Sequence, residues 1–199
     1  ITLPLLGAAD PEPAPAVGEN VRAAALASTV PERPTMSDEI EHFVARASAR
    51  PGESFSKERL FDAHMLAFRA YGDVAHLDQA GRQVDELLAG ATGNEGEVGS
   101  PSVAALRSAA SLRLAEHDFQ GALAAARQLA EVSNHESASY RLFDALWAVG
   151  DKAAAEEILD GTVDTLSTAY LSRKARVVDG AGFTQPARDI FRGVVENVE

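Results

Sequence analysis

The chain contains no cysteine, a single tryptophan and only three lysines. Without cysteine it can form no disulfide, no thiolate metal site and no cysteine nucleophile. Basic residues are in deficit, 18 against 30 acidic ones, and the formal net charge is −12. A protein that binds nucleic acid or an anionic membrane surface needs clustered Lys and Arg to neutralise phosphates. The charge balance therefore argues against both kinds of partner, and no apolar run is long enough to predict a membrane span.

Short motifs that bind zinc or phosphate, or that activate a serine nucleophile, are also missing from the sequence. Three of the five histidines have structural explanations: His64 is expected to be partly buried with satisfied nitrogens, His117 to cap a helix C-terminus and His135 to lie in a capping box. The glycine-rich segment 94–97 offers oxygen atoms of the kind that calcium prefers, but without the ligand order of an EF-hand a solvated acidic loop is favoured. We therefore predict a protein without enzymatic activity, cofactor or metal.

Six of the nine prolines lie at the start of the chain, no later than Pro34. Residues 11–15 predict an extended polyproline-like chain, whereas residues 19–28 are rich in helix formers and predict one short helix. Neither stretch can build a core of its own. We therefore assign residues 1–35 to an extended Pro/Ala-rich N-terminal arm and residues 36–199 to a separate helical domain.

The apolar residues 1–9 are interpreted as the remnant of an export signal, with trimming of the chain as the alternative. Export predicts an extracellular or periplasmic location, and a cytoplasmic one stays open. At about 3.3 Å per residue the arm can reach roughly 110 Å, far beyond the radius of gyration of roughly 15 Å expected for the remaining chain. The arm is therefore long enough to lie on a neighbouring copy, which is the favoured interpretation, and the alternative is that it folds back along the groove of its own chain. A segment without a core becomes ordered only when it packs on such a surface.

From residue 36 onward, apolar residues recur with helical spacing, and Gly, Asp or Pro separate the runs. A first short amphipathic helix is predicted to end at residues 50–52. About four helix hairpins are predicted to follow, with turns at residues 72–73, 117–119, 150–151 and 182–183. The predicted fold class is all-α.

Two helix starts are predicted from capping signals. Pro101 follows Ser100 after the glycine-rich segment, and it is expected at the first helical position, where its missing N–H costs nothing. Ser133 and Glu136 have the spacing of a capping box at the start of a later helix.

A small residue recurs at nearly equal intervals early in the second helix of the last three hairpins, at Ala122, Ala155 and Ala187. Leu159 and Phe191 lie four residues after the last two. This pattern, with the Gly-Asp turns, resembles the tetratricopeptide repeat over residues 56–199. The resemblance implies a TPR-like α-solenoid of four two-helix units that acts in protein–protein interaction. A generic all-α bundle is the alternative fold.

Two groups of apolar residues are candidates for binding. Tyr140, Phe143 and Trp147 lie at helical spacing and either line a groove or belong to the core, with the core favoured. The last helix keeps apolar residues where a capping helix needs a polar face, and these are expected to form an exposed end. They are Ile190, Phe191, Val194 and Val195.

The favoured functional hypothesis is an exported structural protein that binds other copies of itself, and an unclosed contact of this kind produces a filament. The contact is predicted to involve the solenoid ends and apolar residues of the arm, which would be buried in a neighbour. The alternative is a TPR adaptor that holds a peptide of another protein in its concave groove. A regulatory subunit of an enzyme is a third, more distant possibility. The predicted arm residues are Ile1, Leu3, Leu5 and Leu6.

Overall fold

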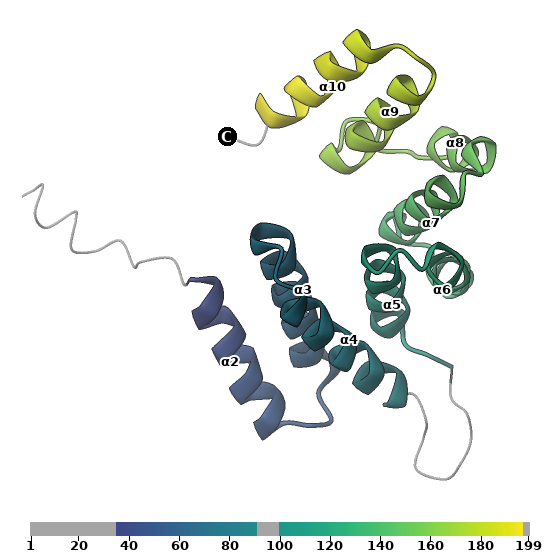
Figure 1. The fold of residues 1–199 in the computed structure, drawn as a ribbon. Helices are drawn as coiled ribbons and strands as arrows, with labels where there is room; N and C mark the ends of the chain where they lie inside the picture. Colours follow the sequence, from purple (N-terminus) through teal and green to yellow (C-terminus); the bar gives the residue numbers. More distant parts are fainter. Residues whose placement is uncertain (1–34, 91–99, 197–199) are drawn as a thin grey trace, which may run out of the picture. The chain divides into compact units, whose positions relative to one another are not determined.

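The structure is a computed structural model that describes residues 35–90 and 100–196. These residues form nine α-helices and no strand, which confirms the all-α class for this part of the chain (Figure 1). The predicted arm, apart from Thr35, lies outside the described residues, and so do Ile1, Leu3, Leu5 and Leu6. The helices are α2 (Met36–Ala49), α3 (Ser54–Tyr71), α4 (Val74–Ala89), α5 (Val103–Ala115), α6 (Phe119–Val132), α7 (Glu136–Val149), α8 (Lys152–Asp160), α9 (Thr168–Gly180) and α10 (Thr184–Glu196).

The hairpin turns share one local design, and their predicted positions are confirmed. A residue in the left-handed conformation ends the first helix, and the aspartate that follows it caps the next helix in three of the four turns. At α7–α8, Gly150 has φ +86° and the Asp151 side chain accepts a hydrogen bond from the Ala154 amide. At α5–α6, His117 takes the left-handed position with φ +62°. Its predicted place at a helix end is thus explained by backbone geometry.

The two predicted helix starts are wrong, because both helices begin slightly later in the chain. Ser102, not Ser100, caps α5 because its side chain accepts from the Ala105 amide, so Pro101 lies before the helix. His135, not Ser133, caps α7: its Nδ1 accepts from the Ser137 amide at 3.2 Å. In both places several neighbouring side chains can accept such a bond, and the packing of the helix decides which one does.

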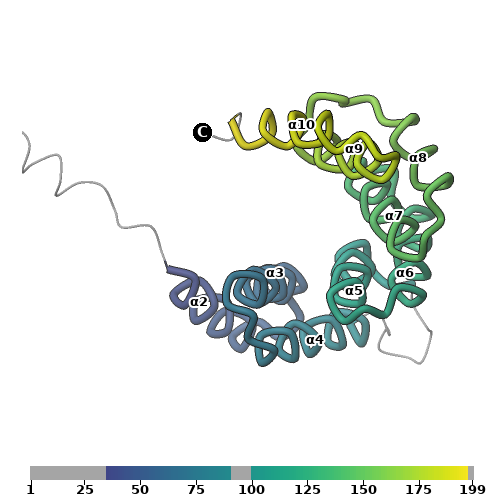
Figure 2. Tube along the Cα trace, turned by 45° about the horizontal axis from the view of Figure 1, so that its top comes forward, coloured from purple at the N-terminus to yellow at the C-terminus, as the bar shows by residue number. Residues whose placement is uncertain are grey.

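Helices pack mainly on their neighbours in the chain (Figures 1 and 2). Three pairs make the most extensive contacts: α3 with α4, α5 with α6, and α9 with α10. Successive pairs are joined by α4 on α5 and by α6 on α7, and the first helices of the early pairs also touch, α3 with α5 and α5 with α7. The described helices therefore form a series of hairpins in chain order.

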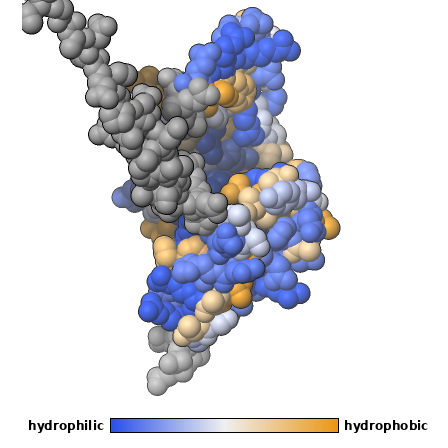
Figure 3. Space-filling view, turned by 90° about the vertical axis from the view of Figure 1, so that its left-hand side faces the viewer, coloured by the Kyte–Doolittle hydropathy of each residue, from blue (hydrophilic) through white to orange (hydrophobic). Residues whose placement is uncertain are grey.

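The core is built from small residues where helices come close and larger ones beside them. Ala122 and Ala155 are fully buried and Ala187 is almost fully buried, each at the position where the repeat predicts a small residue. Leu159 is buried beside Ala155, whereas Phe191 remains 42% exposed. On the face displayed in Figure 3, hydrophobic residues form separate patches between hydrophilic areas. The last hairpin therefore has a buried small residue at the same position as the other hairpins. Its larger apolar residue Phe191, however, is not fully covered by the other described residues.

Helix α2 has no buried residue and contacts α3 through the Phe43–Phe55 ring pair and through polar groups. The Arg46 guanidinium donates two hydrogen bonds to the Glu53 carboxylate, at 2.8 and 2.7 Å, and the Ser56 hydroxyl donates a third. The bonds from Arg46 and then from Ser56 lower the pKa of Glu53 to about 2. Glu53 therefore remains ionised well into the acid range and keeps α2 attached to the start of α3.

We expect Gly150→Ala to destabilise the fold by about 1 kcal/mol, because an L-residue is strained at positive φ. A Cβ at this position would meet no atom within 4 Å, so the loss would come from backbone conformation alone. Urea unfolding followed by circular dichroism measures it. Gly52→Ala is the matched control: that site is equally open but has no left-handed backbone. Equal effects of the two substitutions would contradict the explanation.

Candidate functional site

The candidate site is a cluster of five arginines on the first helices of the hairpins, which we call the arginine cluster. Arg69 lies on α3, Arg107 on α5, Arg141 on α7, and Arg173 and Arg176 on α9. The positive charges of Arg173, Arg69 and Arg107 all act on Arg141. A chain with a net charge of −12 thus concentrates positive charge in one region of its helical domain.

Of the two cluster arginines without an ion pair among the described residues, Arg141 is the more buried. Burial lowers the pKa of its guanidinium, and the neighbouring arginines lower it further, while Asp144 raises it. Arg141 and Arg69 form no ion pair or hydrogen bond with the described residues. A half-buried guanidinium is costly without an anionic partner, because it has lost part of its hydration. A negatively charged group placed beside Arg141 would therefore reduce this cost.

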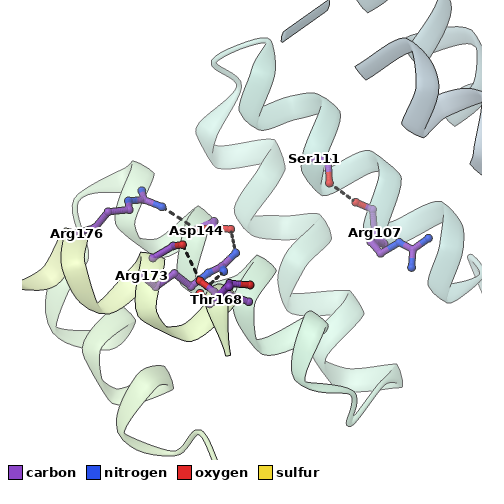
Figure 4. A network of polar contacts seen from close by, with 8 residues as sticks. Arg107, Ser111, Asp144, Thr168, Arg173 and Arg176 are labelled. Atoms are coloured by element: carbon purple, nitrogen blue, oxygen red, sulfur yellow. Dashed lines mark hydrogen bonds and ion pairs between the residues drawn. The ribbon is translucent and has the colours of Figure 1, made fainter. Parts of the chain in front are cut away.

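Asp144 on α7 holds the two arginines of α9. Its carboxylate accepts a hydrogen bond from Arg173, and Arg176 Nη1 lies 2.9 Å from its Oδ1 (Figure 4). The side chains of Asp144 and Arg173 are only 15% and 14% exposed. Arg173 also donates to the carbonyl of Ala169 at 2.8 Å. This ion pair fixes the orientation of both guanidinium groups and joins α9 to α7.

Aromatic rings lie beneath these arginines. Tyr140 and Phe143 are buried, and Trp147 is half-buried. The rings of Phe143 and Trp147 are stacked with centroids 5.7 Å apart. Arg173 lies 4.5 Å from the Tyr140 ring centroid, and Arg176 lies 5.7 Å from those of Phe143 and Trp147. The predicted aromatic group is therefore packed into the core at two positions and supports the arginines through cation–π contacts.

Acidic residues of α3 compensate the other end of the cluster. Glu58 forms an ion pair with Arg107. Desolvation raises the pKa of Asp62, and the charges of Arg59, Arg141 and Arg69 oppose this rise. Among the described residues, Glu58, Asp62 and Asp144 thus set three negative charges against the five positive charges of the cluster, a local excess of two. The Arg59–Glu39 pair beside Asp62 adds one charge of each sign.

Sequence reasoning missed the arginine cluster, although a signal exists. The interval from Arg107 to Arg141 is nearly the same as the interval from Arg141 to Arg173. Both are close to the intervals between the small residues of the repeat. An arginine that recurs with the repeat unit occupies a corresponding place on successive hairpins.

The predicted apolar end of the chain lies on α10. Phe191 and Val195 are exposed, by 42% and 68%, whereas Ile190 and Val194 are half-buried. Ala187 is the only buried residue of the helix, and α9 is its main packing partner. Half of the predicted end residues are therefore accessible in the described part of the chain.

The structure also places the predicted histidines and the remaining motifs. His64 is buried, and its Nδ1 lies 3.0 Å from the Nδ1 of His76. Within residues 35–90 and 100–196, no three His, Cys, Asp or Glu side chains come together in a way that could hold a metal ion. The segment 94–97 lies outside the described residues. No helix in the described ranges is long and apolar enough to cross a membrane.

Comparison of the chain with family models, with curated proteins and with solved structures finds no match.

We expect Asp144→Asn to destabilise the fold by about 2 kcal/mol, because it removes the negative charge that pairs Arg173 in a largely buried position. The free energy of unfolding in urea measures this loss. Asp189→Asn is the matched control: its ion pair with Arg192 is exposed on both sides, and its loss should cost less than about 1 kcal/mol. An unchanged free energy of unfolding in Asp144→Asn would show that this carboxylate is not structural.

Proposed function

We propose that the protein is a non-enzymatic binding protein whose arginine cluster docks an acidic peptide segment of another protein. The observation that carries this proposal is Arg141, which is half-buried, is repelled by three arginines with Asp144 as the opposing charge, and has no ion pair among the described residues. An incoming carboxylate would relieve that repulsion and supply the missing charge-assisted hydrogen bonds. Arg69, which is exposed and also unpaired in the described chain, provides a second position for a carboxylate.

The order of the helices supports a TPR-like arrangement for this binding. In an α-solenoid the first helices of successive hairpins lie side by side, and the contacts of α3 with α5 and of α5 with α7 agree with this. Packed helices are about 8–10 Å apart, and a peptide in the polyproline II conformation rises about 3.1 Å per residue with three residues per turn, so that every third side chain points the same way. Arginines on successive first helices would thus meet every third residue of such a peptide. The proposed ligand has Asp or Glu at intervals of three residues.

The overall charge favours a short acidic segment over a polyanion. The local excess of two positive charges attracts carboxylates at short range. The net charge of −12 repels any long polyanion, such as a nucleic acid, whose length extends beyond the cluster. A peptide with a few acidic residues experiences the local attraction with much less of the long-range repulsion.

Self-assembly is the second candidate function. The observation in its favour is the exposed apolar pair Phe191 and Val195 on α10. Contact between this helix and a different surface of another copy would be heterologous and would extend into a filament unless it closes. In this proposal the protein is exported and the N-terminal arm, residues 1–35, strengthens the contact. An extracellular or periplasmic location belongs to the same proposal.

We expect a fluorescent peptide with Glu at every third position, separated by Ser and Gly, to bind the full chain in the micromolar range at low salt. Arg141→Gln should weaken binding about tenfold, because one charge-assisted hydrogen-bonded pair is lost. Fluorescence anisotropy titrations measure the Kd.

Arg188→Gln on α10 is the matched control, since Arg188 is exposed, lies outside the cluster and should leave the Kd unchanged. A peptide with Lys in place of Glu should not bind. Equal Kd values for the wild type and Arg141→Gln would refute the assignment of the site. Light scattering on the same samples distinguishes self-assembly, which would raise the mass with concentration in the absence of peptide.

A further inference from the structure

His64 on α3 and His76 on α4 face each other directly. Their Nδ1 atoms are 3.0 Å apart, and their ring centroids are 5.3 Å apart. If the two nitrogens point straight at each other, the centroid distance should equal the Nδ1–Nδ1 distance plus one ring radius for each imidazole. The observed distances agree with this. The two nitrogens therefore point head-on at each other, as in a linear N–H···N hydrogen bond. Two ligands that converge on a shared metal ion would instead meet at an angle.

This geometry restricts how many protons the pair can hold. In the neutral pair, one imidazole donates its Nδ1–H and the other accepts with its bare Nδ1. A first extra proton can bind the Nε2 of the donor, which makes the hydrogen bond charge-assisted. A second extra proton has to bind the accepting Nδ1, where it would face the N–H of the partner. The closed pair can therefore carry one positive charge but not two.

Among the described residues, no acidic group acts on His64 to offset a second proton. His64 is only 6% exposed, and burial followed by the charge of His76 lowers its pKa. Helices α2, α4 and α5 pack on α3, and His76 on α4 is the one titratable group among the described residues whose charge acts on His64. The ion pair Lys57–Glu86 also joins α3 to α4, but it acts on neither ring nitrogen of His64.

We propose that the His64–His76 pair is an acid-sensitive latch that holds α3 against α4 near neutral pH and opens when both imidazoles are protonated. The turn at Gly72 and Asp73 connects the two helices and is the hinge of the opening. Because His64 binds a proton less readily in the folded chain than in the unfolded one, the unfolded chain takes up more protons as the pH falls. Stability is thus complete above the ordinary histidine pKa of about 6.5 and decreases below it. The latch does not depend on the ligand of the arginine cluster.

The proposal is tested by urea unfolding of the full chain at pH 7.5 and pH 5.5. We expect the folded-to-unfolded ratio of the wild type to fall by up to about tenfold between these two pH values, because pH 5.5 lies about one unit below the ordinary histidine pKa of about 6.5. The double variant His64→Leu/His76→Leu should lose most of this dependence. The control His42→Gln changes a histidine on α2 outside the pair and should keep it. An equal loss of stability in the wild type and the double variant would overturn the latch.

NMR of the histidine side chains in the folded wild type supplies a test that does not need a variant to fold. At pH 7.5 the pair should show two different tautomers, one protonated at Nδ1 and the other at Nε2. The second proton should bind below the ordinary histidine pKa of about 6.5, and amide exchange in α3 and α4 should increase at that pH relative to α6. Identical tautomers with an independent, unshifted titration at both rings would refute the proposal.

Discussion

Close approach of helices at buried alanines is the constraint on which the rest of the structure depends. Ala80, Ala122 and Ala155 have no exposed surface, and each lies on the second helix of a hairpin. A side chain that ends at Cβ lets two helix backbones come near, so larger neighbours such as Phe143 and Leu159 can fill the space beside the contact. The first helices of the hairpins, which carry the arginine cluster, are positioned by this packing.

The charge distribution is unusual because the acidic chain places its arginines together. Asp144 compensates Arg173 and Arg176, and Glu58 compensates Arg107. Arg141 remains half-buried without an ion pair among the described residues, and three arginines and Asp144 act on it. Positive charge that is partly removed from water and incompletely paired is expected at binding sites rather than in a purely structural core. This contrast is the physical reason for preferring the arginine cluster to the apolar end of α10 as the proposed binding site.

Local rules predicted the hairpins well because their signals lie within a few residues. A glycine that adopts positive φ followed by a capping aspartate marks the turn in the sequence itself, as at 72–73 and 150–151. The starts of α5 and α7 were predicted slightly too early because each has two candidate caps within one turn. These are Ser100 and Ser102 for α5, and Ser133 and His135 for α7. The TPR-like stacking stays a prediction, as does everything assigned to residues 1–34.

The sequence by itself determined the helices, the turns and the net acidity. Helix periodicity and turn conformation depend on residues that are close together in the chain, and the net charge depends on the composition as a whole. Only the tertiary structure decided that Arg141 is surrounded by arginines from other helices and that His64 meets His76 head-on. Such pairings depend on the rotation of each helix about its axis. That rotation is set by how side chains from distant segments pack, and no local pattern specifies it.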